Sequence, residues 1–312
     1  MKYYFAPMEG ITGYLYRNAF HSFFPDIDKY FTAFLVPNEK GKLNTREKKD
    51  ILPEHNEGIY LVPQIMTNRA DCFLAGERTL RNYGYREINL NLGCPSKTVV
   101  SKCRGAGFLA KPKELDHFLE EVFAHTACEI SVKTRIGGDD PEEFLRLLEI
   151  YNKYPLKELI IHPRTQKEFY KGTPHQDVFA YGELHSRNPV CYNGNIDSLG
   201  AYEAWAGRFP EADRVMIGRG LLTNPGLVGV LKGGEAPEKE RIRRFHDAVY
   251  EAYKEEMPGS RVVLFKMKEL WVYLIGLFTD SAGYGKRIRK AQKLPAYEDA
   301  VRDLFAEREM IS

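Results

Sequence analysis

The chain has 312 residues, which is long enough for one large α/β barrel or for two domains. Its composition is that of a globular protein, with 43% hydrophobic and 28% charged residues. No apolar run approaches the ~20 residues that a membrane span requires. The 45 basic residues almost balance the 43 acidic ones, so the net charge of +2 predicts no general affinity for nucleic acid.

The N-terminal stretch MKYYFAPMEGITG has no long apolar segment and no small-residue cleavage site. We therefore expect a mature, cytoplasmic protein without membrane contact. The five cysteines are an odd number, widely spread and without a CxxC pair. This spacing predicts free thiols, with neither a disulfide framework nor a metal site. We also expect a monomer.

Apolar or β-branched runs alternate with longer amphipathic stretches up to about residue 234, a pattern typical of parallel βαβ units. The stretches 112–125 and 141–154 carry apolar side chains at helical spacing. Units of this number and length match a (β/α)8 TIM barrel, and a doubly wound open sheet is the alternative. The predicted strands are residues 3–7, 30–37, 60–65, 87–93, 129–137, 158–164, 189–195 and 214–220.

Polar residues, glycines or prolines follow most of these runs. They are Pro7, Met8 and Glu9; Gln64; Asn91 and Cys94; Lys133 and Arg135; His162 and Arg164; Asn193, Gly194 and Asn195; and Gly218 and Arg219. The carboxyl ends of barrel strands converge on one face, where barrel enzymes carry their active sites, whereas an open sheet gathers only a few segments. The pattern therefore favours the barrel.

The pattern changes after Gly234. Residues 239–256, 261–278 and 295–309 have a helical period, and breakers lie at 258–260 and 280–285. We expect a catalytic barrel over residues 1–236 and a smaller helical bundle over residues 237–312.

A basic run lies within this helical region. Its cations are Lys286, Arg287, Arg289, Lys290 and Lys293, and no acidic residue occurs between Ser281 and Tyr297. Such a run is either a solvated helix face or a surface that contacts nucleic-acid phosphates, and the sequence leaves both open.

The stretch INLNLGCPSKTVVSKCRGAG raises the question of why a buried strand leads to a thiol. Gly93 allows a sharp turn, and Pro95 restricts the backbone after Cys94. Cysteines are usually core residues, but a core cysteine would lie inside the apolar run, and Cys94 follows its end. We therefore expect Cys94 at the mouth of the barrel with a catalytic role.

The same stretch resembles the signature of the dihydrouridine synthases, flavoenzymes that reduce uridines in tRNA. The match includes Asn91, Gly93, Cys94 and Pro95, followed by Val99 and Gly105-Ala106. The segments APMEG, PQIM, SVKTRIG, IHPRTQ, YNGNI and MIGRG are similar to other strand ends of the family. The resemblance implies an FMN-binding TIM barrel followed by a helical domain, with NADPH or NADH as reductant.

The resemblance also implies a flavin site. The loops at Asn193, Gly194 and Asn195 and at Gly218 and Arg219 are expected to hold the phosphate of FMN. Gln64 is expected at the imide edge of the isoalloxazine and Lys133 beside its N1/C2 carbonyl side. His162 is expected near the same region or the phosphate, although a lone histidine is more often a core residue. Pro7, Met8 and Glu9 are expected to line the dimethylbenzene side.

In the family's mechanism hydride reaches C6 of uracil and a cysteine protonates C5, and Cys94 matches that cysteine. A thiol with an ordinary pKa near ~8.5 is mainly protonated at neutral pH, as an acid must be. Asn91 is expected to read the uracil edge. The uridine must leave its stack, so the RNA needs a cationic surface. We expect Arg135, Arg164, Lys286, Arg287, Arg289 and Lys290 to form part of it.

Three other functions remain open from the sequence. A flavin-dependent reductase of a small pyrimidine or enoate would use the same barrel, although such a substrate needs neither the basic loops nor the helical domain. Ribosomal RNA is an alternative substrate to tRNA. A non-catalytic RNA-binding protein is the third alternative.

Overall fold

The computed structural model describes residues 1–311, which pack as two compact units. The barrel unit contains Met1–Pro7, Asp28–Asn195 and Trp205–Met216. The helical unit contains Met8–Ile27, Ile196–Ala204 and the chain from Ile217 onward. This division differs from the expected boundary after residue 236, because short segments of the predicted barrel pack with the C-terminal helices. The boundary between the functional domains stays a prediction.

A parallel sheet forms the centre of the barrel unit. Its order is β3-β2-β1-β9-β8-β7-β6-β5-β4. The strands are β1 Lys2–Phe5, β2 Lys29–Phe31, β3 Leu61–Val62, β4 Gln64–Ile65, β5 Glu87–Leu92, β6 Glu129–Arg135, β7 Leu159–His162, β8 Val190–Tyr192 and β9 Arg214–Ile217.

The two ends of this sheet are consecutive in the chain. Only Pro63, which has no backbone N–H, separates β3 from β4, so the two strands are halves of one extended segment. β3 pairs with β2 and β4 pairs with β5, which closes the sheet into a barrel of eight strand segments. The predicted (β/α)8 barrel is confirmed, and the open sheet is excluded.

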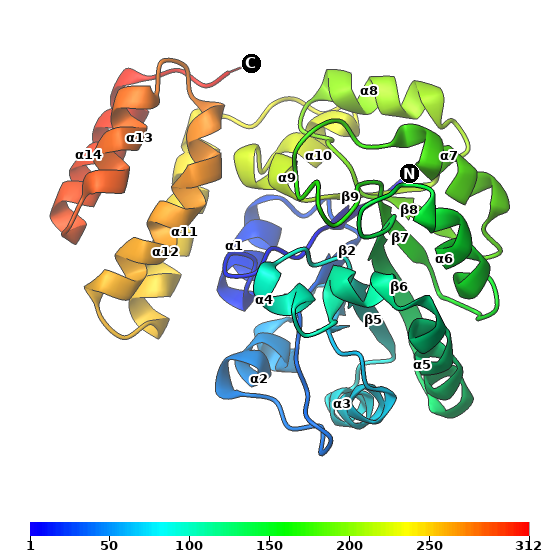
Figure 1. Cartoon of the computed structure of the whole chain (residues 1–312). Helices are drawn as coiled ribbons and strands as arrows, with labels where there is room; N and C mark the ends of the chain where they lie inside the picture. Colours follow the sequence, from blue (N-terminus) through cyan, green and yellow to red (C-terminus); the bar gives the residue numbers. More distant parts are fainter. Residues whose placement is uncertain (312) are drawn as a thin grey trace. The chain divides into compact units, whose positions relative to one another are not determined.

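Helices alternate with the strands, and α3, α5, α6 and α7 lie outside the sheet (Figure 1). On α5 the side chains of Leu115, Phe118, Leu119 and Val122 are buried at helical spacing, as the sequence predicts. The helices with residues in this unit are α2 Thr45–Ile51, α3 Ala70–Asn82, α4 Lys97–Val100, α5 Pro112–His125, α6 Glu143–Tyr151, α7 Gln176–His185 and part of α8 Leu199–Arg208, with 3-10 turns at Pro53–His55 and Gly105–Ala110.

The barrel interior is layered. An apolar layer of Tyr4, Ala6, Phe31, Val62, Ile160, Cys191 and Met216 fills its middle. Strands alternate their side chains between two faces, so polar residues on β5, β6 and β7 share the inner face with this layer. Glu87, Asn89 and Asn91 are spaced in this way along β5. Polar groups therefore lie at both ends of an apolar core.

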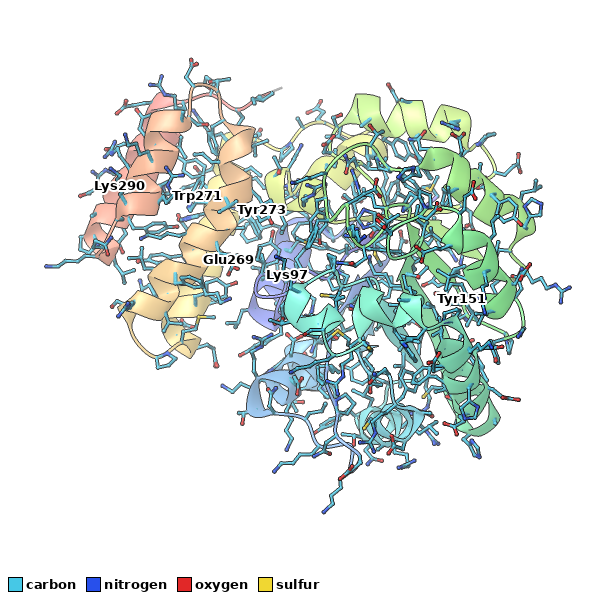
Figure 2. All side chains as sticks on the ribbon, in the orientation of Figure 1. Lys97, Tyr151, Glu269, Trp271, Tyr273 and Lys290 are labelled. Carbon is cyan, nitrogen blue, oxygen red and sulfur yellow. The ribbon has the colours of Figure 1, made fainter. Side chains whose placement is uncertain are left out.

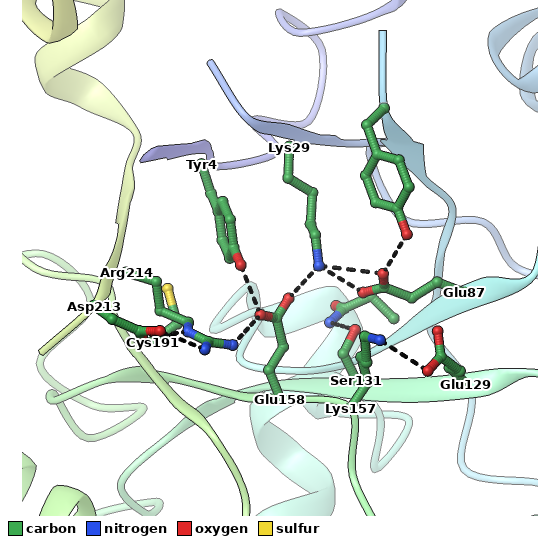
Figure 3. A network of polar contacts seen from close by, with 12 residues as sticks. Tyr4, Lys29, Glu87, Glu129, Ser131, Lys157, Glu158, Cys191, Asp213 and Arg214 are labelled. Atoms are coloured by element: carbon green, nitrogen blue, oxygen red, sulfur yellow. Dashed lines mark hydrogen bonds and ion pairs between the residues drawn. The ribbon is translucent and has the colours of Figure 1, made fainter. Parts of the chain in front are cut away.

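A closed ion network lies at the amino ends of the strands (Figure 3). Lys29 Nζ contacts Glu87 Oε1 at 2.9 Å and Glu158 Oε1 at 2.8 Å. Tyr4 and Tyr60 donate hydroxyl hydrogen bonds to Glu158 and Glu87, respectively, and Arg214 Nη1 lies 3.3 Å from Glu158 Oε2. Burial, together with the charge of Glu158, raises the pKa of Tyr4. Arg214 also pairs with Asp213 at 2.6 Å, so every charged group of the network has a partner.

The helical unit has its own aromatic cores. The rings of Tyr16, Phe20 and Phe24 pack edge-on against Phe245, with centroids 5.5–6.1 Å apart. A second core surrounds Trp271 on α12, which is 3% exposed (Figure 2). The helices are α1 Tyr14–Phe23, α9 Arg219–Thr223, α10 Leu227–Leu231, α11 Lys239–Glu256, α12 Ser260–Leu274, α13 Ala282–Lys290 and α14 Leu294–Glu307, with a 3-10 turn at Ile275–Leu277.

Within the described residues, no helix combines the length and the apolar character needed to cross a membrane.

Candidate active site

Cys94 lies in a tight turn directly after β5. The backbone N–H groups of Gly93 and Cys94 both donate to Asn91 Oδ1, with N···O distances of 3.0 Å. The carbonyl of Cys94 accepts from the N–H of Ala106 at 3.0 Å. Gly105 has a φ of +53°, and a Cβ there would lie 2.9 Å from the Cys94 carbonyl oxygen. The glycine is therefore needed for the loop to close on Cys94.

The Cys94 thiol is half-buried, whereas Cys103 on the same loop is exposed. Cys103 has a φ of +50°, in the left-handed region that few side chains adopt. The structure thus gives the two thiols different surroundings. Only Cys94 belongs to the turn that Asn91 holds.

Gln64 lies on β4 next to this turn and is 1% exposed. Its Oε1 accepts from Asn91 Nδ2 at 2.7 Å, and its Nε2 donates to Asn89 Oδ1 at 2.8 Å. A carboxamide has two N–H groups and two lone pairs, so one donor and one acceptor position remain for a ligand. The Asn91 amide is used inside the protein, and its predicted contact with uracil stays a prediction.

Lys133 lies opposite Asn91 in the register of β5 and β6 and is only partly exposed. Its Nζ has no hydrogen-bond or ion-pair partner among residues 1–311. Burial, aided by the positive charge of Arg135, lowers the pKa of Lys133 to about 8. An unpaired, partly desolvated cation of this kind is suited to an anionic ligand group.

Arg135 and Arg164 are not on the surface, which corrects the expectation that they form an exposed cationic face. They are 1% and 0% exposed. Arg135 Nε donates to the carbonyl of Gly93 at 2.9 Å, and its Nη1 donates to the carbonyl of Thr165 at 2.8 Å. Arg164 donates to the carbonyls of Lys171 and Gly172. Both guanidinium groups therefore organise loops, because loop carbonyls need donors when they are covered.

His162 ends β7 and is 8% exposed. Arg164 Nη1 lies 2.9 Å from its Nε2, and because a guanidinium only donates, this nitrogen accepts. The ring of Tyr170 lies 6.0 Å from the His162 ring and 5.4 Å from the Arg135 guanidinium carbon. Tyr170 itself is 46% exposed. His162 is thus fixed from both sides by the loop that follows β7.

The loop after β8 approaches its neighbours closely. Asn193 Nδ2 donates to the carbonyl of Met216 at 2.8 Å, which joins the ends of β8 and β9. A Cβ on Gly194 would lie 2.0 Å from the Tyr192 hydroxyl, so only glycine fits there. Asn195 is exposed, and its Oδ1 accepts from Arg164 Nη2 at 3.3 Å.

The remaining predicted flavin residues, apart from Pro7, belong to the helical unit. Met8 begins a tight turn in which the N–H groups of Ile11 and Thr12 donate to its carbonyl, and Glu9 is exposed. Lys266 Nζ on α12 donates to the carbonyl of Gly10 in this turn. Gly218 precedes α9, and Arg219 is its partly exposed first residue. Pro7 is partly exposed in the barrel unit.

The basic run up to Lys290 lies on α13, where Lys286, Arg287, Arg289 and Lys290 are exposed. Figure 2 labels Lys290 on this helix. Arg287 pairs with Asp303 on α14 at 2.6 Å. The other three have no acidic partner within the described part of the chain. A groove between α13 and α14 is lined by Gly283, Lys286, Arg287, Lys290, Ala291, Ala296 and Asp299.

The sequence interpretation missed two polar groups. Asn89 supports Gln64, and its signal was the alternation of Glu87, Asn89 and Asn91 along one face of β5. Lys266 contacts Gly10 across a long stretch of chain, and no local pattern identifies that contact.

The donor set of the barrel unit fits a flavin. Lys133 offers an unpaired cation for a carbonyl group that gains negative charge, and Gln64 offers one donor and one acceptor for an imide edge. The Asn193–Asn195 loop offers backbone and amide groups in a position where TIM barrels bind phosphate.

Comparisons with known proteins agree with this picture. A family model described as dihydrouridine synthase matches residues 4–293. The tRNA-dihydrouridine(16) synthase of Shigella flexneri is 31% identical over 248 residues, covering 75% of this chain and 76% of that protein. The tRNA-dihydrouridine synthase B of Pasteurella multocida is 28% identical and covers 73% and 68%. Among solved structures, morphinone reductase is 10% identical with a TM-score of 0.52 over 76% of this chain and 87% of that one, a likeness of fold alone.

Proposed function

We propose that this chain, which belongs to the dihydrouridine synthase family, reduces the C5=C6 bond of uridine in tRNA to 5,6-dihydrouridine. The family match over residues 4–293 carries the proposal. Relatives named as tRNA-dihydrouridine synthases favour tRNA over ribosomal RNA and over a small pyrimidine or enoate. The protein is an FMN-dependent oxidoreductase with NADPH or NADH as reductant.

FMN, when bound and reduced, supplies the hydride for C6 of uracil. Lys133 holds a positive charge beside the N1/C2 carbonyl side, and Gln64 binds the imide edge. Asn193, Gly194, Asn195, Gly218 and Arg219 bind the phosphate, with His162 beside them. Pro7, Met8 and Glu9 line the remaining edge of the ring system.

Cys94 Sγ gives its proton to C5 as the hydride arrives at C6, and the resulting thiolate regains a proton from solvent. The Asn91 and Ala106 hydrogen bonds support this role, because they fix the backbone on both sides of the thiol. Arg135 and Arg164 act from inside the protein by holding the loops around the site.

The target uridine leaves its stack to reach Cys94, and the rest of the tRNA lies on cationic surfaces. Lys286, Arg289 and Lys290 support this role for α13, because they are exposed and have no acidic partner within residues 1–311. We expect the enzyme to act as a monomer in the cytoplasm, where its tRNA substrate is found.

The first test is Cys94→Ala, with Cys103→Ala as the matched control. Loss of a general acid lowers a rate by about 10²- to 10⁴-fold, so uridine reduction should fall by this factor in Cys94→Ala and stay near the parent rate in Cys103→Ala. Bound flavin and its reduction by NADPH should remain in both variants. The measurement is dihydrouridine formed in transcribed tRNA under single-turnover conditions.

Parent-like turnover in Cys94→Ala would assign the proton to another group. A parent protein that contains no flavin and forms no dihydrouridine would contradict the proposed function itself. Mapping dihydrouridine in RNA from cells that lack the protein then identifies the RNA and the position reduced.

The second test replaces Lys286, Arg287, Arg289 and Lys290 with Gln. For each RNA phosphate that is no longer neutralised, the slope of log K against log[salt] should become shallower by about 0.7 to 0.9. Affinity should weaken equally for modifiable and unmodifiable RNAs, with flavin content unchanged. Replacing the exposed Lys40, Lys42, Lys48 and Lys49 with Gln removes the same number of charges and is the matched control. Fluorescence anisotropy with labelled tRNA gives the slopes, and equal slopes in both variants would make α13 a solvated face.

A further inference from the structure

Four buried polar side chains connect the Cys94 turn to strand β6 without a gap. Asn91 Nδ2 donates to Gln64 Oε1 at 2.7 Å, and Gln64 Nε2 donates to Asn89 Oδ1 at 2.8 Å. Asn89 Nδ2 then donates to Ser131 Oγ at 2.9 Å. We refer to Asn91, Gln64, Asn89 and Ser131 as the carboxamide relay.

The direction of this relay is set at one end only. The N–H groups of Gly93 and Cys94 are obligatory donors, so the Asn91 atom that both contact must be the oxygen. The Asn91 nitrogen therefore faces Gln64, which must present its oxygen, and the same logic fixes Asn89. Ser131 imposes no direction, because a hydroxyl can donate or accept.

The relay is also all-or-none. Its four side chains are between 0% and 7% exposed, so water has little access to repair a mismatch. Turning one carboxamide alone would place two oxygens or two NH₂ groups against each other at hydrogen-bonding distance. A buried mismatch of this kind is costly, so the three carboxamides reverse together or not at all.

We propose that Asn91 is a positioning residue that joins the Cys94 turn to the orientation of the Gln64 carboxamide. The N–H groups of the turn bind Asn91 Oδ1, so Asn91 presents its NH₂ group to Gln64. This contact fixes which end of the Gln64 carboxamide is the oxygen, and with it the positions of the remaining N–H and lone pair. The isoalloxazine imide edge alternates donor and acceptor groups, so a reversed carboxamide mismatches it. This inference rests on the proposed function, in which Gln64 binds that edge.

Asn91→Asp reverses the relay without removing any of its members. The new carboxylate still accepts from Gly93 and Cys94, but it cannot donate to Gln64 Oε1. Gln64 must turn its NH₂ toward residue 91, Asn89 must turn as well, and Ser131 becomes the donor at the far end. The heavy atoms keep their places while donors and acceptors exchange.

Asn89→Asp is the matched control. It places the same charge on the other side of Gln64, but a carboxylate at position 89 accepts from Gln64 Nε2 just as Asn89 Oδ1 does. The Ser131 hydroxyl rotates to donate, and the direction of the relay is kept. The two variants therefore differ in direction and not in charge.

The readout is the affinity of the apoprotein for oxidised riboflavin, which is uncharged and so responds weakly to the added charge. We expect Asn91→Asp to weaken binding about tenfold or more, the effect of one hydrogen-bonding mismatch, and Asn89→Asp to change it less than about threefold. The Asn91→Asp loss should shrink as the pH falls, because a protonated carboxyl group regains a donor. The Gly93 and Cys94 amides should stay protected from hydrogen exchange, which shows that the turn is intact.

Equal affinities in the two variants would overturn the relay proposal while leaving the proposed function in place. A parent protein that binds no flavin would contradict the proposed function instead. If Asn91→Asp does not fold, the parent protein still tests the proposal by NMR. The Gly93 and Cys94 amides should then show scalar couplings across their hydrogen bonds to the Asn91 side-chain carbonyl carbon, and absence of both couplings would overturn it.

Discussion

The two ends of strands β5, β6 and β7 carry polar side chains of opposite character. At the amino ends, Glu87 and Glu158 neutralise Lys29 and Arg214, and Tyr4 and Tyr60 complete the carboxylate hydrogen bonds (Figure 3). At the carboxyl ends, Lys133 has no partner among the described residues, and Gln64 keeps one donor and one acceptor position. An apolar layer lies between them.

This difference shows how one barrel separates stability from function. Paired groups at the amino ends have little capacity left for a ligand, whereas unpaired groups at the carboxyl ends carry a desolvation penalty that a ligand can remove. The lowered pKa of Lys133, about 8, reflects that penalty. The carboxyl ends of these strands therefore carry polar groups with unused hydrogen-bonding positions, whereas the polar groups at the amino ends are paired within the protein.

The largest expected effect comes from breaking the ion network at the amino ends of the strands. Glu158→Gln removes the carboxylate that contacts both Lys29 and Arg214. Lys29 keeps Glu87 and Arg214 keeps Asp213, but the buried carboxylate loses its charge toward Lys29, Arg214 and Tyr4 at once, which should lower the free energy of unfolding by about 3–5 kcal/mol. Urea unfolding of the apoprotein measures this loss, and riboflavin affinity at low temperature should stay unchanged.

Glu129→Gln is the matched control, because Glu129 begins β6 at the same end and pairs with Lys157 at 2.8 Å. Its side chain is 57% exposed, and exposed pairs contribute about 0–1 kcal/mol. Similar losses in the two variants would mean that burial does not distinguish the network from an ordinary surface pair.

A medium effect on stability, of opposite sign, is expected at the carboxyl ends of the strands. Lys133→Met removes a partly desolvated, unpaired charge, so the apoprotein should gain about 1–3 kcal/mol of stability at pH 7. In the holoenzyme the same change should lower the flavin midpoint potential by about 30 mV or more, because the reduced flavin loses a nearby cation.

The pH dependence gives the sign of this effect. The pKa of Lys133 is about 8 in the folded chain and near ~10.4 when unfolded, so the unfolded state binds more protons between these values. Stability of the parent relative to Lys133→Met should therefore rise with pH across this window and be lowest below pH 8. The exposed Lys113→Met is the control. A constant difference from about pH 7 to about pH 10.5 would rule out a desolvated Lys133.

Much of this architecture could be predicted from periodicity. The predicted apolar runs begin within a residue of the observed strands, but most of them extend two to six residues beyond the strand ends. The helices α5 and α11 have the bounds that the pattern predicts. The pairing of the segment around Pro63 with β2 before the proline and with β5 after it could not be predicted, because strand pairing is a non-local property. The packing of residues 8–27 with the C-terminal helices has no local signal for the same reason.

The sequence predicted which residues lie near the site better than it predicted what each of them contacts. Cys94 occupies the expected turn, and Lys133 the expected strand end. Arg135 and Arg164 were expected on the surface, since charged residues at strand ends usually reach solvent, but loop carbonyls fold over them and bind their guanidinium groups. Which donor a covered carbonyl uses depends on loop conformation, and a sequence pattern does not report it.

The smallest expected effect tests how much a single hydrogen bond of the ion network at the amino ends contributes to stability. Tyr60 donates to Glu87 Oε2 at 2.8 Å, and its ring lies 5.6 Å from Lys29 Nζ. Tyr60→Phe keeps the ring beside the cation and removes only the hydroxyl. The expected loss is about 0.5–1.5 kcal/mol in the free energy of unfolding, the range of one hydrogen bond.

Tyr83→Phe is the matched control for this change, because the Tyr83 hydroxyl has no hydrogen-bond partner within residues 1–311. A surface substitution of this kind should stay within about 0.5 kcal/mol of the parent. The Tyr60→Phe loss should be smaller in a Glu87→Gln background, because a neutral amide oxygen accepts a weaker hydrogen bond than a carboxylate, and a double-mutant cycle measures the difference. A loss of the same size there would assign the effect to the exposed ring, and the ion network at the amino ends would then depend on packing as much as on charge.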